Sequence, residues 1–348
     1  MNEPLRRRPG LAAGALALLL LAPTLGLASP RPVRSRTVRF VYQATVRDIP
    51  ADATRAALWI PSPPDTAYQT IRDLTITSDL PHEMVNEVRF GNRAVRFALP
   101  PGTRKATATL SFEVTRFEHR HEIGAGPDAG AAPEAATTAR ATLPTAVWLQ
   151  PDRRVPLDAT IRGWAKETVA GQTTSLGKAR AIYDYVVDNL SYDKTGTGWG
   201  QGDIYWACDA RRGNCTDFHA IFIGYARAVG IPARFEIGFP LPADRGQGQI
   251  GGYHCWTEFN VEGEGWIPVD ASEANKHPER REYFFGAHDE NRVLFTIGRD
   301  LVLPGMQDAP LNFFIYPYVE VDGAAFSHVE RQFSYQDVST SPPHTASR

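Results

Sequence analysis

The chain has 348 residues, 43% of them hydrophobic and 22% charged, and a formal net charge of −2 at pH 7. This length and apolar content suffice for more than one hydrophobic core, so two domains are expected. No lysine-rich or arginine-rich block follows the first 28 residues, which argues against a nucleic-acid partner.

The first 28 residues have the parts of a Sec-type signal peptide. Three arginines at 6–8 precede a leucine- and alanine-rich run at 11–27 that ends in small residues. We therefore predict a signal peptide over 1–28, cleaved near Ala28, and a periplasmic or secreted protein with a net charge of −4. An uncleaved N-terminal anchor is the alternative. No later run approaches the roughly 20 apolar residues of a spanning helix, so the mature protein is expected to lack a transmembrane domain.

Residues 36–122 show the alternating and β-branched pattern of short strands, which predicts a β-sandwich-like domain. Gly91-Asn92 stands between two of these strands as a hairpin signal. His119 and His121 are interpreted as solvent-facing groups at a strand end, with a metal-binding pair as the alternative. The expected strands are 37–46, 57–60, 71–76, 87–90, 94–97 and 107–114.

Residues 123–145 are rich in alanine, glycine, proline and threonine, which predicts a flexible linker or long loop. The following region, 146–335, is expected to be the second domain, and the residues after it to be frayed. Apolar spacing predicts helices over 157–170 and from Ser175 onward. A glycine-rich stretch at 192–202 then carries Trp199 and is either a lid over substrate or an inert connector.

The next helix is expected to begin with a cysteine in its first turn. Phe218 opens a run of apolar residues at helical spacing, Asn214 is a natural N-cap, and Gly230 followed by Ile-Pro ends the pattern. Cys215 therefore lies where unpaired backbone N–H groups concentrate positive potential, which favours a thiolate. A small buried hydrophobic side chain is the plainer interpretation of a lone cysteine.

A β-hairpin is expected about forty residues further on, with arms at 253–261 and 266–270. A turn centred on Glu262 would set His254 beside Asp270, and a slip of one residue would separate them. With Cys215, these side chains would supply the nucleophile, base and orienting group of thiol catalysis. A structural histidine and a turn-capping carboxylate are the alternatives.

A thiol enzyme also needs donors for the oxyanion of the attacked carbonyl. The backbone N–H of Cys215 is the first candidate. Trp206 is preferred over Trp199 as a second donor, and Trp256 is a further candidate for the substrate cleft. Packing is the alternative role for these tryptophans. Glycine-rich loops on both sides of the site indicate an open cleft for an extended substrate, and further strands are expected at 234–239, 293–297 and 312–319.

Three sequence blocks in order resemble the transglutaminase-like superfamily of bacterial proteins. They are Gly-Asn-Cys-Thr-Asp-Phe-His at 213–219, Tyr-His-Cys-Trp-Thr-Glu-Phe at 253–259 and Gly-Trp-Ile-Pro-Val-Asp at 265–270. The resemblance implies an α+β papain-like, transglutaminase-like core with Cys215, His254 and Asp270 as catalytic residues. The strand pattern described above places an N-terminal β-sandwich before this core. His219 and Cys255 stand where many family members have small apolar residues, so a ligand or redox role for them stays open.

The three cysteines allow a Cys208–Cys255 disulfide or free thiols. A zinc site that uses Cys215, His219 and His254 is the competing chemistry, but no Cys-x-x-Cys pair supports it. No EF-hand pattern is present, so neither calcium dependence nor any other cofactor or metal is expected.

Three functions remain. The first is an exported cysteine peptidase, amidase or transglutaminase-like acyl transferase. It would attack amide or ester carbonyls of peptides or proteins, cell-envelope proteins among them, through a thioester on Cys215. The second is an inactive transglutaminase-like binding scaffold, and the third is the zinc protein. The presence of Cys215, His254 and Asp270 in this order along the chain favours the first of these functions, the enzyme.

Overall fold

The computed structural model describes residues 33–124 and 143–338, so the predicted signal peptide and most of the predicted linker lie outside the described residues. Contacts join the described residues into one compact unit. The division into domains at 36–122 and 146–335 stays a prediction. Among the helices in the described ranges, none has the length and apolarity to cross a bilayer.

Two five-stranded antiparallel sheets form the predicted β-sandwich, with strand orders β11-β18-β1-β6-β3 and β17-β16-β2-β5-β4. Alternate side chains of the two sheets, such as Phe40 and Phe97, share one core. The fold class is confirmed. The strands of the first sheet are β1 (Ser35–Val46), β3 (Gln69–Thr77), β6 (Ala106–Phe117), β11 (Gln247–Gln249) and β18 (Val329–Asp337). Those of the second are β2 (Ala56–Ser62), β4 (His82–Asn86), β5 (Arg93–Leu99), β16 (Tyr318–Val321) and β17 (Ala324–Ala325).

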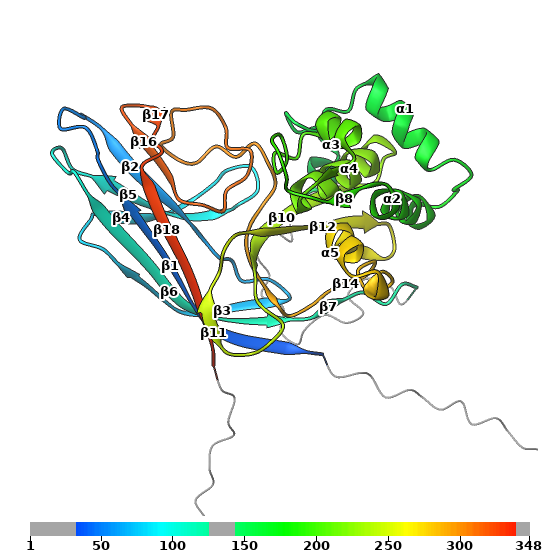
Figure 1. Cartoon of the computed structure of the whole chain (residues 1–348), viewed down its shortest axis with the longest axis horizontal. Coiled ribbons are helices and arrows are strands. Elements are labelled where there is room, and N and C mark those ends of the chain that lie inside the picture. The colour runs from blue at the N-terminus through cyan, green and yellow to red at the C-terminus, as the bar shows by residue number, and fades with distance from the viewer. Residues whose placement is uncertain (1–32, 125–142, 339–348) are drawn as a thin grey trace, which may run out of the picture. The chain divides into compact units, whose positions relative to one another are not determined.

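The C-terminal part of the chain completes this sandwich. Strand β18 pairs with β1 from Val38↔Asp337 to Val46↔Val329, and β16 pairs with β2 (Figure 1). The expectation that the chain frays after residue 335 is therefore wrong as far as Asp337. Its strand character comes from a partner almost 300 residues away, which local pattern does not reveal.

Two expected strands differ from the structure. Residues 87–90 form the turn between β4 and β5, because the carboxylate of Glu87 accepts hydrogen bonds from the backbone N–H groups of Arg89 and Phe90. Glu87 also accepts a bond from the Asn92 side chain, so the hairpin signal at 91–92 is right although the strand stops earlier. In the expected strand 312–319, only the end belongs to a strand, β16.

The second half of the fold packs helices against a four-stranded sheet of order β13-β12-β10-β15. The two helices predicted before the cysteine are confirmed, and the short α3 was not predicted. The strands are β10 (Ala233–Pro240), β12 (His254–Val261), β13 (Gly265–Val269) and β15 (Arg292–Ile297). The helices are η2 (Thr145–Leu149), α1 (Ala159–Thr168), α2 (Ser175–Asn189), α3 (Ile204–Ala210), α4 (Cys215–Ala228), α5 (Ala271–Lys276) and η3 (Pro278–Arg280). Two further sheets have two short strands each. One pairs β7 (His119–Arg120) with β14 (Ala287–His288), and the other pairs β8 (Ser191–Tyr192) with β9 (Arg212–Gly213).

Helix α4 begins and ends as predicted but is more deeply buried. Asn214 caps its N-terminus, and Gly230 follows its end with φ +84°. Every residue from Cys215 to Arg227 is buried, whereas one buried face was expected. A Cβ at Gly224 would overlap Ile204, so the absence of a side chain there lets α3 pack closely on α4. The cysteine-bearing helix is thus the centre of this half of the fold.

Candidate active site

The N-terminus of α4 is held in place by one buried carboxylate. Asp217 accepts hydrogen bonds from the backbone N–H groups of Gly200, Gly202 and Asn214, with N···O distances of 2.7, 3.0 and 2.9 Å. Arg299 also donates to the Gly202 carbonyl. The glycine-rich loop is therefore anchored beside α4 at 200–202, which argues against a lid hinged there.

The hairpin formed by β12 and β13 has a different register from the one expected. Thr257 lies opposite Val269, so the next step sets Asp270 opposite Trp256 rather than His254. The slip is two residues, and side chains two apart on a strand share a face. Asp270 therefore stays a diagonal neighbour of His254 and reaches it from the N-cap of α5.

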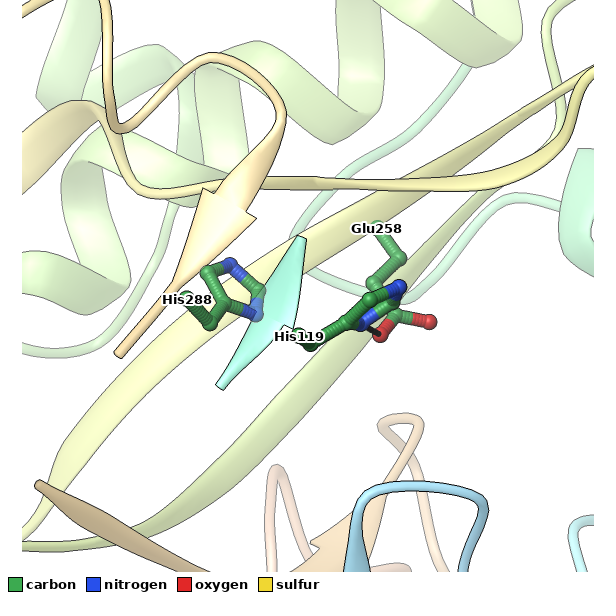
Figure 2. A group of neighbouring side chains, drawn as sticks. All are labelled: His119, Glu258 and His288. Carbon is green, nitrogen blue, oxygen red and sulfur yellow. Dashed lines mark ion pairs between the residues drawn. The ribbon is translucent and has the colours of Figure 1, made fainter. Parts of the chain in front are cut away.

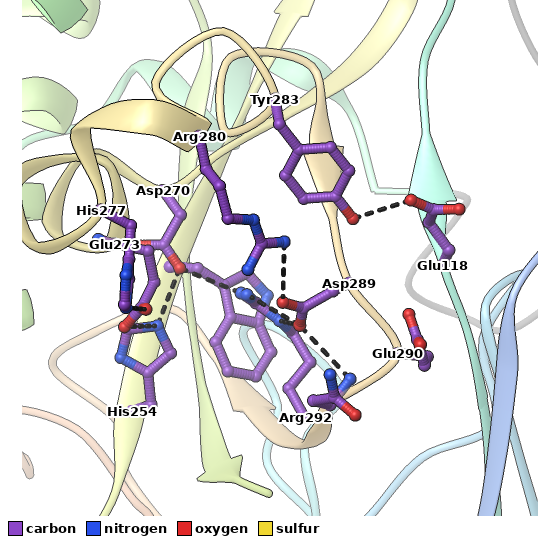
Figure 3. Close-up of polar contacts among 12 residues, drawn as sticks. Glu118, His254, Asp270, Glu273, His277, Arg280, Tyr283, Asp289, Glu290 and Arg292 are labelled. Atoms are coloured by element: carbon purple, nitrogen blue, oxygen red, sulfur yellow. Dashed lines mark hydrogen bonds and ion pairs between the residues drawn. The ribbon is translucent and has the colours of Figure 1, made fainter. Parts of the chain in front are cut away.

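The structure brings Cys215, His254 and Asp270 together. The Nε2 atom of His254 lies 2.8 Å from Oδ2 of Asp270, which leaves Nδ1 for Cys215, and Cys215 and His254 are hydrogen-bonded through their side chains (Figure 3 shows the His254–Asp270 part). The three residues are 1%, 6% and 0% exposed, respectively. Because so little of the thiol meets solvent, access is narrower than the open cleft expected from the loops.

Electrostatics favour a thiolate–imidazolium pair. Burial lowers the pKa of His254, but the charge and hydrogen bond of Asp270 and the contact with Cys215 outweigh burial and raise the pKa to about 10. Burial likewise raises the pKa of Cys215, but hydrogen bonds from Cys255 and His254 and the charge of His254 hold the pKa well below its ordinary value. The site is built to keep the sulfur negatively charged at neutral pH.

Asp270 is held by more partners than the sequence indicated. Its Oδ2 also accepts a bond from Nη1 of the buried Arg292 at 3.1 Å (Figure 3). Its Oδ1 accepts bonds from the Ser272 hydroxyl and the Glu273 backbone N–H. Burial raises the pKa of this carboxyl, but the positive His254 and Arg292 hold the pKa well below its usual range. Arg292 went unnoticed because its signal, one charge at the start of an apolar strand, is weak.

Replacing Asp270 with asparagine is expected to lower kcat by a factor of roughly 10²–10⁴. The amide removes the charge that raises the pKa of His254 and no longer fixes the ring orientation. The His254 pKa, followed by NMR of the imidazole, should fall together with kcat. Ser272→Ala is the matched control, because it removes one bond to the same carboxylate and leaves its charge. A wild-type His254 pKa in the asparagine variant would contradict this role.

Cys255 lies against the Cys215 thiol on the α4-facing side of β12. Its Sγ is 3.6 Å from the Thr216 hydroxyl and 3.7 Å from Nδ1 of His219, and it is hydrogen-bonded to Cys215. Alternation turns it away from His254, as expected, but thereby points it at the cysteine helix. All three cysteines are free thiols, so a Cys208–Cys255 disulfide is not formed.

Replacing Cys255 with alanine is expected to raise the pKa of Cys215 by about one unit, since a hydrogen bond to a charged group contributes about 1.5–3 kcal/mol and sulfur is a weak donor. The measurement is the pH dependence of alkylation by iodoacetamide. Cys255→Ser keeps a donor and should stay near the wild-type profile. Identical shifts in the two variants would show that volume, and not the hydrogen bond, sets the thiol pKa.

His219 is also enclosed in the site. Its Nε2 is 3.7 Å from Oδ1 of Asp270, and burial lowers its pKa. Tyr253, which sequence reasoning did not single out, accepts a hydrogen bond from the Asn214 amide at 2.9 Å and lies 2.8 Å from the Thr216 hydroxyl. It thereby ties the residue before His254 to the first turn of α4.

The three tryptophans have different positions. Trp256 is buried, and its indole N–H donates to Glu236 at 2.6 Å, so it is not available as an oxyanion donor. Trp199 donates to the Gly196 carbonyl at 3.1 Å. Trp206 is half-buried against Gly198. The roles of all three tryptophans at the substrate cleft stay predictions.

The remaining candidates lie apart from the triad. Cys208 lines a cavity of about 800 Å³ whose other walls include Trp164, Tyr185 and Tyr225, and none of the triad residues lines it. In the described ranges, Cys215, His219 and His254 do not form a three-ligand metal cluster. The interpretation of His119 and His121 as solvent groups is wrong, because both rings are buried, at 3% and 8% exposure.

In this α+β fold, the cysteine at the tip of α4 faces a histidine at the start of β12 and an aspartate at the N-cap of α5. Residues 162–271 match the transglutaminase-like superfamily. The chain therefore contains a transglutaminase-like core, as the three sequence blocks indicated.

The similarity to known proteins extends beyond this core. A protein of Haemophilus influenzae described as uncharacterized is 25% identical over 317 residues, which cover 81% of this chain and 85% of that protein. A structure from Cytophaga hutchinsonii, described as a candidate cysteine protease, has a TM-score of 0.60 at 17% identity and covers 89% of this chain and 93% of its own. The periplasmic domain of TgpA from Pseudomonas aeruginosa is a weaker likeness, with a TM-score of 0.33 at 15% identity over 70% of this chain and 90% of that one.

Proposed function

We propose that the protein is an exported cysteine-dependent enzyme that attacks amide or ester carbonyls of peptides or proteins through a thioester on Cys215. The observation that supports this most is the buried hydrogen bond between His254 and Asp270 beside a thiol of lowered pKa. An inert core cysteine would have no reason to face an oriented imidazole.

The reaction proceeds in two halves. The Cys215 thiolate attacks the carbonyl carbon, and the first backbone N–H of α4 donates to the oxyanion. As the tetrahedral intermediate collapses, the C–N or C–O bond breaks, and the His254 imidazolium gives its proton to the leaving group. The neutral His254 then removes a proton from water or from an amine, which attacks the thioester and releases the thiolate. Asp270 stabilises the imidazolium throughout.

Export and substrate rest on separate observations. The basic, apolar and small-residue segments of 1–28 support a signal peptide and a periplasmic or secreted location. A thiol at the tip of a buried helix suits an extended chain that can enter a narrow opening, so peptides and cell-envelope proteins are the proposed substrates. Hydrolysis and acyl transfer to an amine share every step up to the thioester.

The decisive experiment incubates the protein with a peptide library that contains glutamine and lysine peptides. Mass spectrometry then scores cleavage, deamidation and amine incorporation separately. At least one product is expected with the wild type and none with Cys215→Ala. Absence of all three products, with the thiol still reactive toward iodoacetamide, would leave a binding scaffold as the function. Cleavage alone identifies a peptidase, and incorporated amine a transglutaminase.

A further inference from the structure

A second cluster of buried side chains joins three strands on the opposite side of β12 from the cysteine helix. His119 from β7, Glu258 from β12 and His288 from β14 are 3%, 4% and 0% exposed. Each offers a ligand atom within 4.8 Å of the other two (Figure 2). The pairing of β7 with β14 sets His119 directly opposite His288, so backbone register brings the imidazoles together.

Three ring nitrogens of the two histidines in this cluster lack hydrogen bonds within the described residues, whereas Glu258 is paired with Arg234. Both ring nitrogens of His288 and Nδ1 of His119 are buried without a hydrogen-bond partner in the described part of the chain. His119 Nδ1 lies 3.1 Å from Oε1 of Glu258, close enough for an ion pair if the ring is protonated. Leaving a buried polar group unpaired destabilises the fold. The two unpaired ring nitrogens of His288 are the clearest sign of a missing partner, and a metal ion shared with His119 and Glu258 would supply one.

We propose that His119, Glu258 and His288 bind a zinc-type divalent cation. Two imidazoles and one carboxylate are a ligand set that zinc takes with three protein ligands. Bonds of about 2.0–2.2 Å place tetrahedral ligand atoms roughly 3.3–3.5 Å apart. Side-chain rotation therefore has to shorten separations of up to 4.8 Å by at most about 1.5 Å. The hard cations calcium and magnesium prefer all-oxygen sites and do not fit.

Neighbouring arginines limit the affinity but do not remove the site. Arg234 forms an ion pair with Glu258, and it also lies 3.2 Å from Glu236, so it keeps a carboxylate partner when Glu258 turns to a metal. Arg116 and Arg292 add positive charge nearby. Since these charges oppose any dication, the site selects by the strength of imidazole bonding and not by electrostatic attraction.

The cation would brace the sheet that carries the catalytic residues. Glu258 is four residues beyond His254 on the same face of β12, and His288 precedes Asp289, which pairs with Arg292. Arg292 in turn bonds Asp270. The proposed role is structural, because the cluster does not contact the reacting thiol.

The test measures metal binding in the full chain with Cys215→Ala, so that zinc on the catalytic thiol is not counted and the result does not depend on activity. After equilibration with micromolar zinc and desalting, elemental analysis should give one zinc per chain. His288→Asn and, independently, Glu258→Gln should each reduce this to near zero. His121→Gln is the matched control, because His121 is a buried histidine two residues from His119 and outside the cluster.

Cobalt substitution identifies the ligands. Cobalt bound to nitrogen and oxygen ligands shows visible bands without the near-ultraviolet charge-transfer band of a cobalt–thiolate bond. Zinc should also raise the Tm of the Cys215→Ala chain and leave the Tm of the His288→Asn chain unchanged, whatever the basal stability of that variant. Less than a tenth of a zinc per chain, equal zinc in all variants, or a thiolate band would each overturn the proposal.

Discussion

Replacing His254 with alanine is expected to abolish turnover, with a loss of kcat on the order of 10⁴–10⁶, and to remove the reactivity of Cys215 at neutral pH. Residues that act as one catalytic unit lose almost the whole effect when one of them is removed. The variant loses the imidazolium that holds the thiolate and also the proton donor for the leaving group. The hydrogen bond from Cys255 remains, but without the imidazolium the burial of the thiol raises the pKa of Cys215.

The pH profiles follow from the direction of these shifts. In the native protein the thiolate is populated above the lowered pKa of Cys215, so alkylation should be level through neutral pH and fall only on the acid side. His254 stays protonated up to its pKa of about 10. Above that pH, turnover should fall because the leaving group receives no proton, whereas alkylation should not fall. In His254→Ala, the alkylation profile should move to alkaline pH.

The measurement is the rate of alkylation by iodoacetamide from pH 4 to 11, read at the Cys215 peptide by mass spectrometry so that Cys208 and Cys255 are scored separately. A small reagent suits a thiol that is only 1% exposed. His277→Ala is the matched control, because His277 is an exposed histidine that follows α5 directly. If neutral-pH alkylation is the same in His254→Ala and the wild type, the imidazole does not activate the thiol and the enzyme proposal fails.

The second large effect is on stability. Asp217→Ala is expected to lower the free energy of unfolding by about 3–5 kcal/mol, because three backbone N–H groups lose their acceptor in a buried site. The same carboxylate completes the capping box of α4 with Asn214. The loop at 200–202 would lose its anchor to α4, so activity should fall as well.

Urea unfolding followed by circular dichroism measures this loss. Asp217→Asn keeps one acceptor oxygen and should lose less stability than the alanine variant. Asp209→Ala, at an exposed position on the neighbouring helix α3, should change the free energy by less than about 0.5 kcal/mol. Equal small losses in Asp217→Ala and Asp209→Ala would show that the loop is held by other contacts, with Arg299 the next candidate.

Local sequence pattern was sufficient for the elements whose signals lie within one turn or one hairpin. The bounds of α4 could be predicted because its N-cap, apolar spacing and terminal glycine all fall within about twenty residues. The arms at 254–261 and 265–269 could be predicted for the same reason. Chain order and motif spacing also indicated that Cys215, His254 and Asp270 converge. This convergence required only that the hairpin register differ from the expected one by an even number of residues, because His254 and Asp270 then stay on the same face.

Tertiary structure alone decided what depends on pairing between distant segments. The register of β12 with β13, the contact of Arg292 with Asp270 and the addition of β18 to the sandwich arise where the chain returns after tens to hundreds of residues. No local periodicity encodes those returns. His119 and His288 illustrate the limit, because each looks like an isolated polar residue until two short strands place the rings in one buried cluster with Glu258. Sequence determined which side chains stand at the ends of helices and strands, and packing determined which of them meet, because burial and strand register are properties of the whole fold.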